Sequence, residues 1–308
     1  MDIVCGGCAR SPCFARHIMV DLSKLKTTAK PGHVVQPLGM NPVHGPIRSK
    51  HIVLVLGVGP GLGRSLARTF AEQGYTIAIM SRSKARLDSW AKEFDQIIRT
   101  KWEQDGERVP LTSSPLARAF ACDVQDIESI KIAFRDIQAT WPDKLIGTCL
   151  YNASIRKRGP FLDIPVSKLK DSVEANIIAP YVFAQESLRA MNKHRQGGTI
   201  IFTGATSSVR GAAGFAPFAA SKGGLRNMCQ SLAREYGEQN VHIAHVIVDG
   251  LIESKTALSY FGLPTTERFQ DGLALVPDEM AKSWLFLAQQ HPSTWTFEMD
   301  LRPAKEHF

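Results

Sequence analysis

The stretch HIVLVLGVGPGLGRSLARTFAEQGYTIAIMSR, residues 51–82, decides the fold. Its first part, HIVLVLGVG, is a short apolar run that ends in glycine and predicts a buried strand. GRSLARTFAEQGY, residues 63–75, has apolar residues at helical spacing, and TIAIMSR, residues 76–82, is a second buried strand. A buried strand, a glycine-rich turn, a helix and another buried strand form one strand–helix–strand unit.

The same alternation continues to the carboxyl-terminal part of the chain, with helical segments between apolar runs. These runs are ARAFACDV, LIGTCLYNAS, GTIIFTGA and VHIAHVIVDG. Near-continuous apolar strands that alternate with helices imply a parallel sheet covered on both faces. We therefore expect one α/β domain, a doubly wound parallel sheet, over about residues 49–308. Residues 1–48 hold five prolines without sustained periodicity, which predicts an irregular N-terminal extension.

Composition excludes several other classes of function. The formal net charge is +8, but residues 1–50 account for seven basic and two acidic side chains, so the remaining chain is only mildly basic. No nucleic-acid-binding motif accompanies this charge, and no apolar run is long enough to span a membrane. Cys5, Cys8 and Cys13 lack a well-spaced fourth zinc ligand, so no metal site is expected. The location is predicted as cytoplasmic, with a weak organellar alternative in the basic N-terminus.

The glycine-rich turn predicts a nucleotide site. Gly57, Gly61 and Gly63 follow the pattern G-x-x-x-G-x-G between a buried strand and a helix. A helix N-terminus attracts a pyrophosphate, and glycines there avoid a collision between side chains and the phosphates. The alternative is a tight strand–helix turn that binds nothing.

The residues after the second strand bear on the choice of cofactor. A site for NAD usually places an acidic residue here, whereas this chain has Ser81, Arg82 and Ser83. The guanidinium of Arg82 can pair with the 2′-phosphate of NADP, and no carboxylate repels that phosphate. NADP is therefore expected in preference to NAD. A solvated surface arginine is the alternative.

Further motifs in the same order resemble the short-chain dehydrogenase/reductase family, over residues 51–254. CDV is similar to the family's segment over the adenine, which implies Asp123 and Val124 as cofactor contacts. YNAS resembles the family's N-N-A-G and retains Asn152. Asn176 and Lys222 align with the asparagine and the lysine of the catalytic tetrad. The resemblance implies a Rossmann-like fold, a nicotinamide cofactor, a small-molecule substrate, and a homodimer or homotetramer formed through the helices that bear Asn176 and Lys222.

Two tetrad positions depart from this family pattern. The tyrosine position is Phe218 in FAASKGG, and the serine position, thirteen residues earlier, is Ala205. Some enoyl reductases of the family place their tyrosine seven residues before the lysine, but that position is Phe215. IIFTGATSSVRGAAGFAPFAASKGGLR, together with STWTFEMDLRP near the C-terminus, resembles an atypical subgroup with phenylalanine in place of tyrosine.

Loss of these two hydroxyls disfavours ordinary carbonyl reduction. In ordinary members of the resembled family, the tyrosine supplies the proton and the serine holds the carbonyl oxygen. Removing a general acid typically lowers a rate by roughly 10²–10⁴. Thr206 and Tyr260 are the first candidates for a replacement donor, with Ser207 and Ser208 beside Thr206. Thr203 is less favoured because it should lie inside a strand, and Asp249 is a further acid–base candidate. Each of these is alternatively an ordinary surface or core side chain.

Two more segments are expected near the site. By the resemblance, DGLIES takes the place of the family's segment around the nicotinamide, so that Ile252 contacts the cofactor and Ser254 replaces a threonine. Arg156, Lys157 and Arg158 follow YNAS at the expected mouth of the pocket. This basic run either receives an anionic substrate or is a solvated loop.

The sequence therefore predicts an NADP-dependent oxidoreductase with an atypical active site that acts on an unidentified small organic substrate. Hydride addition to an activated alkene or iminium fits best, because the proton can then come from water, the substrate or another residue. Two alternatives remain at this point. One is a non-redox enzyme or a pseudoenzyme on the same fold, and the other is a scaffold whose assembly responds to the cofactor.

Overall fold

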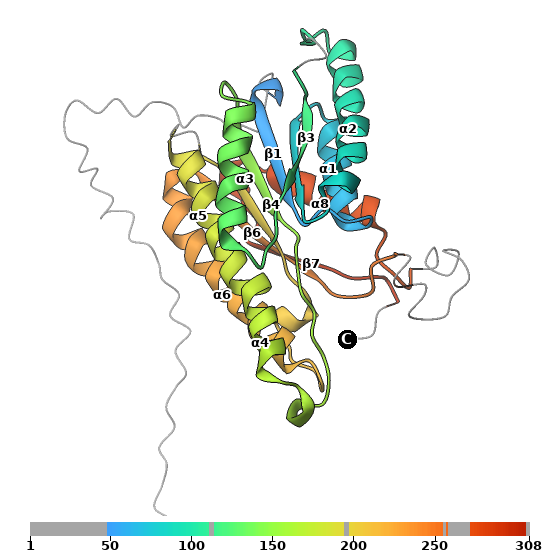
Figure 1. Cartoon of the computed structure of the whole chain (residues 1–308), viewed down its shortest axis with the longest axis vertical. Helices are drawn as coiled ribbons and strands as arrows, with labels where there is room; N and C mark the ends of the chain where they lie inside the picture. The colour runs from blue at the N-terminus through green and yellow to red at the C-terminus, as the bar shows by residue number, and fades with distance from the viewer. Residues whose placement is uncertain (1–47, 111–113, 194–196, 255–256, 258–271, 306–308) are drawn as a thin grey trace, which may run out of the picture. The chain divides into compact units, whose positions relative to one another are not determined.

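A computed structural model describes residues 48–110, 114–193, 197–254, 257 and 272–305 of the chain. Seven parallel strands form one sheet in the order β3-β2-β1-β4-β5-β6-β7 (Figure 1). Their bounds are β1 His51–Leu56, β2 Thr76–Ser81, β3 Ala117–Ala121, β4 Leu145–Tyr151, β5 Gly198–Thr203, β6 Val241–Val248 and β7 Glu298–Leu301. The doubly wound parallel sheet expected from the sequence is confirmed.

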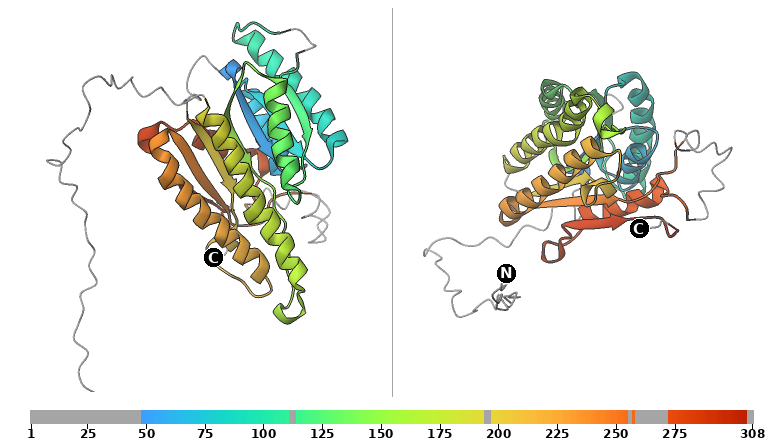
Figure 2. Two further views of the ribbon diagram at one scale, coloured as in Figure 1. Left: turned by 60° about the vertical axis from the view of Figure 1, so that its left-hand side comes forward. Right: turned by 90° about the horizontal axis from the view of Figure 1, so that it is seen from below.

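Helices cover both faces of this sheet (Figure 2). One apolar core joins it to α1 (Leu62–Glu72), α2 (Lys84–Gln104) and α8 (Pro277–Ala288). The other joins it to α3 (Ile127–Thr140), α5 (Ala179–Asn192) and α6 (Ala216–Tyr236). The short α4 (Val166–Val173) precedes α5. Apolar residues therefore fill two layers, one on each side of the strands.

Strand β1 shows why the central strands have almost no polar residues. Val53 and Val55 pack into the core with α1 and α2, whereas Ile52, Leu54 and Leu56 pack into the core with α3 and α5. Successive side chains of a strand point to opposite faces, so a strand with helices on both faces needs apolar residues at every position.

Strand β7 was not predicted from the sequence. Its four residues, EMDL, lie at the edge of the sheet beyond β6 and are only half-buried or exposed. An edge strand of this kind buries too little surface to require an apolar run, so hydrophobic patterning does not reveal it. The extension predicted for residues 1–48 lies outside the described residues, apart from Arg48 in a short 3₁₀ helix.

The order of the strands sets the position of the functional crevice. β1 lies between β2 and β4, so the chain proceeds to one side after β1 and to the other side after β4. At such a reversal the connections leave the carboxyl ends of the two strands in opposite directions and open a crevice between them. The glycine-rich turn after β1 and Asn152 after β4 both lie at this edge.

The glycines of this turn serve two different purposes. A Cβ atom at Gly57 would lie 2.4 Å from the backbone nitrogen of Ala153, and one at Gly63 would lie 2.5 Å from the carbonyl oxygen of Gly57. Gly57 also has a φ of +95°, which disfavours other residues. At Gly59 and Gly61 a Cβ would meet nothing within 4 Å. Gly57 and Gly63 are therefore required by the fold, and Gly59 and Gly61 leave open space.

We expect Gly57→Ala to lower the free energy of unfolding by about 3 kcal/mol, because the added methyl group meets backbone atoms at a residue of positive φ. Gly59→Ala is the matched control and should change that free energy by about 0.5 kcal/mol or less. Urea unfolding followed by circular dichroism measures both. Equal stability of the two variants would contradict the close contact between the first turn and the end of β4.

Candidate active site

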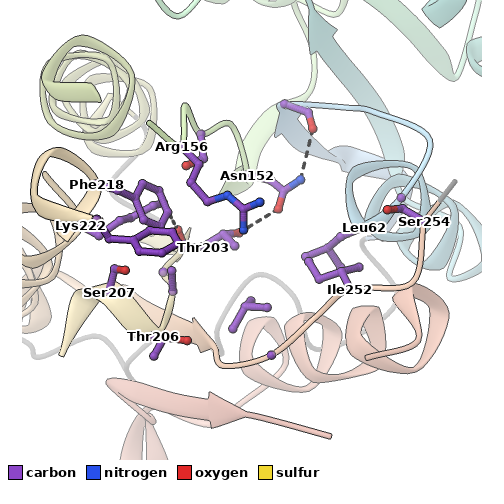
Figure 3. Close-up of a pocket in the computed structure, with 18 of the residues that line it drawn as sticks. Leu62, Asn152, Arg156, Thr203, Thr206, Ser207, Phe218, Lys222, Ile252 and Ser254 are labelled. Atoms are coloured by element: carbon purple, nitrogen blue, oxygen red, sulfur yellow. Dashed lines mark hydrogen bonds between the residues drawn. The ribbon is translucent and has the colours of Figure 1, made fainter. Parts of the chain in front are cut away.

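A cavity of about 780 Å³ opens at the carboxyl ends of β1, β4, β5 and β6 (Figure 3). The glycine-rich turn forms one wall and the first turns of α6 form the opposite wall. Its lining includes most of the residues that the sequence singled out. These are Gly57, Gly61, Gly63, Asn152, Arg156, Thr203, Ala205, Thr206, Ser207, Phe215, Phe218, Lys222, Ile252 and Ser254.

A line of hydrogen bonds crosses the cavity. The side-chain amide of Asn152 donates to the Gly57 carbonyl at 3.2 Å, and its oxygen accepts from the Thr203 hydroxyl at 3.1 Å. The Lys222 ammonium then donates to the Thr203 carbonyl at 2.8 Å (Figure 3). These bonds join the ends of β1, β4 and β5 to α6. Thr203 is the last residue of β5, as the sequence predicts, and it also lines the cavity.

Lys222 is buried rather than a surface lysine. Only 2% of the residue is exposed, and burial lowers the pKa of its ammonium to about 8. The nitrogen lies 5.9 Å from the centre of the Phe218 ring, which is itself buried. A lysine with a pKa near neutrality can release a proton in the physiological range, which an ordinary lysine cannot do readily.

Most hydroxyls around the cavity already have a hydrogen-bond partner. Thr203 donates to Asn152, and Ser154 donates to the side-chain oxygen of Asn176 at 2.9 Å. Ser208 is buried and accepts from the backbone N–H of Ala205, so it turns away from the site. Among the cavity-lining residues of the described chain, Ser207 is the hydroxyl without a recorded partner, and it lies on the side of Phe218 and Lys222 (Figure 3).

Thr206 lines the cavity, but its hydroxyl proton points to Asp249, outside the cavity lining. Its hydroxyl donates to Asp249, a buried carboxylate that also lies 3.7 Å from the Arg210 guanidinium and 3.4 Å from that of Arg302. In this arrangement Thr206 presents lone pairs to the cavity, and Asp249 acts on the site only through its neighbours.

Asn176 lies in a π-helical turn, Glu174–Ile178, between α4 and α5. The residue is completely buried, and its amide nitrogen donates to the Ile155 carbonyl at 3.0 Å and to the Ser221 hydroxyl at 3.1 Å. Together with the bond from Ser154, these contacts satisfy both ends of the side chain. Asn176 thus ties the segment after β4 to α6, one residue before Lys222, and does not line the cavity.

Three residues predicted to contact the cofactor lie at the same edge of the sheet but outside the cavity lining. Arg82 follows β2 and is exposed. Asp123 follows β3, and its carboxylate accepts the backbone N–H of Gln125 at 3.0 Å. Val124 is half-buried against the core of α3 and α5. All three follow β2 or β3, the strands that lie beyond β1 on the side of the crevice away from β4.

The segment after β6 forms part of the cavity wall. Ile252 lines the cavity and pairs with Leu275 through an isolated β-bridge. The hydroxyl of Ser254 accepts the backbone N–H of Ala257 at 3.0 Å. Tyr260, the second candidate proton donor, lies outside the described residues, as do Cys5, Cys8 and Cys13.

The basic run after YNAS separates into different roles. Arg156 lines the cavity and its guanidinium points into it, between Phe218 and Asn152 (Figure 3). Lys157 forms an ion pair with Asp171 at 3.2 Å. Arg158 does not line the cavity. Sequence reasoning did not single out Gly59 and Arg210, although both line the cavity and both lie within stretches that it quoted.

The described residues hold neither a metal-binding cluster nor a membrane-spanning helix. No cluster of three or more histidine, cysteine, aspartate or glutamate residues could hold a metal ion there. Within the same part of the chain, no helix is both long and apolar enough to cross a membrane. Cys122, Cys149 and Cys229 are free and buried.

Comparison with known proteins places this geometry in context. The family model for short chain dehydrogenases matches residues 51–259. Carbonyl reductase family member 4 of Danio rerio is 25% identical over 77% of this chain and 91% of its own. A short-chain dehydrogenase structure from Rhodopseudomonas palustris is 30% identical, covers 82% of this chain and 99% of that one, and has a TM-score of 0.63. An alcohol dehydrogenase structure from the archaeon Thermococcus sibiricus is 19% identical, covers 83% and 98%, and has a TM-score of 0.66.

We expect Lys222→Met to raise the free energy of unfolding at pH 7 by about 2 kcal/mol. Burial of a charged ammonium destabilises the folded protein, and a lowered pKa of this size corresponds to about 3 kcal/mol, less about 1 kcal/mol for the lost hydrogen bond. The folded pKa is about 8 and the ordinary value is 10.5. Between these pH values the unfolded chain binds more protons, so the wild type gains stability as pH rises and the difference shrinks.

Urea unfolding at pH 7 and pH 9.5 measures this difference, with the exposed Lys170→Met as the control that should show neither effect. A difference between Lys222→Met and wild type that does not change with pH would mean that Lys222 is solvated.

Proposed function

This chain belongs to the short-chain dehydrogenase family of oxidoreductases, and from that premise we propose that it is an NADP-dependent reductase with an altered proton donor. One observation carries the proposal. One cavity, at the crevice between β1 and β4, is lined by Gly59, Gly61, Asn152, Lys222 and Ile252. In this family the same positions surround a nicotinamide dinucleotide.

The residues of the cavity fit such a cofactor. Gly59 and Gly61 leave room for a pyrophosphate at the N-terminus of α1, where backbone N–H groups and the helix dipole favour negative charge. Lys222 and Asn152 would hold the nicotinamide end, together with the backbone near Ile252. When bound, the nicotinamide supplies a hydride to the substrate.

Arg82 supports NADP over NAD. Its side chain is exposed directly after β2 and forms no recorded ion pair within the described residues, so it is free to meet a 2′-phosphate. No acidic residue stands at Ser81 or Ser83 to repel that phosphate. The Thermococcus sibiricus enzyme, which shares the fold, was solved with 5-hydroxy-NADP.

In place of the family's tyrosine and serine, Lys222 and Ser207 are the groups best placed to act. The Lys222 ammonium has three N–H donors, of which one is engaged with Thr203. Its lowered pKa makes it a competent acid near neutral pH. Ser207 offers a hydroxyl on the same side of the cavity, whereas Thr206 donates to Asp249. These donors suit hydride addition to an activated alkene or an iminium, in which less charge develops on an oxygen.

The protein also has a surface suited to self-association. A groove of about 840 Å³ runs between α5 and α6, and the half-exposed Tyr181 lies on it with Met228 and Leu232. We keep the homodimer or homotetramer through these helices as a proposal. A cytoplasmic location is likewise proposed, because Cys122, Cys149 and Cys229 are free thiols.

Calorimetric titration with NADPH and, separately, NADH tests the cofactor. We expect binding that favours NADPH by about tenfold or more, since an arginine–phosphate contact contributes roughly 1.5–3 kcal/mol. Arg82→Asp should remove that preference. Arg86→Asp, an equal change of charge in the first turn of α2, is the control and should bind as wild type does. If neither cofactor binds, the non-redox alternatives lead.

Restoring the missing hydroxyls tests whether they are what separates this site from a ketone reductase. We expect the Ala205→Ser/Phe218→Tyr variant to reduce small ketones at least about 10²-fold faster than wild type, as absorbance at 340 nm reports, with NADPH affinity unchanged. A variant that binds NADPH but gains no ketone reduction would show that the cavity itself no longer positions a carbonyl. Binding of NADPH without turnover of any activated alkene would favour a cofactor-sensing protein.

A further inference from the structure

From the charges around the cavity we infer that the substrate carries a carboxylate or another organic anion, which Arg156 binds. This inference rests on the proposed function, since it concerns the substrate of the same site. Among the lining residues of the described chain, Arg156, Arg210 and Lys222 are cationic and none is acidic. An anionic group in this cavity therefore meets only attraction from its walls.

Arg156 is available to such a group. Its guanidinium points into the cavity and forms no recorded ion pair within the described part of the chain. By contrast, Lys157 beside it is paired with Asp171 at 3.2 Å. The planar guanidinium can form two parallel hydrogen bonds with a carboxylate, which makes arginine the usual partner of such a group in a binding site.

Arg210 adds positive charge from a different loop. Its side chain is 49% exposed and reaches Asp249 only at 3.7 Å. Asp249 also accepts the Thr206 hydroxyl and lies 3.4 Å from Arg302, so its negative charge is shared among several partners. Arg210 therefore retains N–H donors for a ligand in the cavity.

The two loops that bear these arginines are joined. The backbone N–H of Gly159 donates to the carbonyl of Gly214 at 2.9 Å, and this bond links the segment after β4 to the segment before α6. The two cationic side chains are consequently carried by loops held at a fixed spacing. A site that is held in place in this way loses less entropy on binding.

The rest of this end of the cavity is apolar. Ala205, Ala212, Phe215 and Phe218 contribute its walls beside Lys222. Such walls favour a substrate with a small hydrophobic body next to its anionic group, such as a conjugated carboxylic acid. Lys222, near Phe218, then lies within the same pocket as the reacting part of that body.

Binding to the protein–NADPH complex tests the inference with two pairs of probes, trans-cinnamate against cinnamamide and crotonate against crotonamide. We expect each carboxylate to bind at least about tenfold tighter than its neutral amide. Arg156→Gln should remove that preference and leave NADPH and amide affinities unchanged. Arg158→Gln, on the same loop but outside the cavity lining, is the control and should behave as wild type does.

Three results would overturn the inference: equal affinity for carboxylate and amide, no binding of any probe, or an Arg156→Gln variant that loses affinity for NADPH alone. The last result would assign Arg156 to the phosphates of the cofactor. If wild type does not bind NADPH, the proposed function fails separately, and the same titrations without cofactor decide whether the carboxylate preference is present.

Discussion

The contact between the first turn and the end of β4 is the constraint on which the whole site depends. Gly57 lies against the backbone of Asn152 and Ala153 so closely that no side chain fits. This approach lets the Asn152 amide reach the Gly57 carbonyl, and from Asn152 the bonds continue through Thr203 to Lys222. The crevice between β1 and β4 thus has a polar floor that spans the ends of three strands and α6. A fixed floor of this kind is what allows neighbouring side chains to bind a ligand without rearrangement.

Hydrophobic patterning predicted most of the fold because the central strands have no solvent-facing side. Their residues are therefore almost all apolar, and each strand is followed by a turn and a helix. Hydrophobic patterning did not predict β7, because this edge strand has little buried surface. The sequence explained the glycines of the first turn in one way, as space for phosphates. In the structure Gly59 and Gly61 border open space, whereas Gly57 and Gly63 are needed for contact within the protein.

The positions of the site residues along the chain were predictable, but the directions of their hydrogen bonds were not. Lys222 and Asn152 came from spacing within motifs. That Asn176 is fully engaged in joining two segments, and that Thr206 donates to Asp249, depend on contacts between residues far apart in the sequence. The sequence also does not indicate which residue of the run Arg156, Lys157 and Arg158 faces the cavity. These facts arise only when loops from separate strand ends meet.

The burial of Lys222 is the strongest physical argument that the cavity still binds a ligand. A charged group with 2% of its surface exposed destabilises the fold, and its hydrogen bond to a single carbonyl offsets only part of that. An apolar residue of similar size would fill the same space between Phe218 and β5 without this cost. The tyrosine that such a lysine assists elsewhere in the family is absent here, so that partnership does not explain the charge. A ribose hydroxyl or a substrate atom in need of a proton does explain it, because either one uses the N–H donors that the protein itself leaves unused.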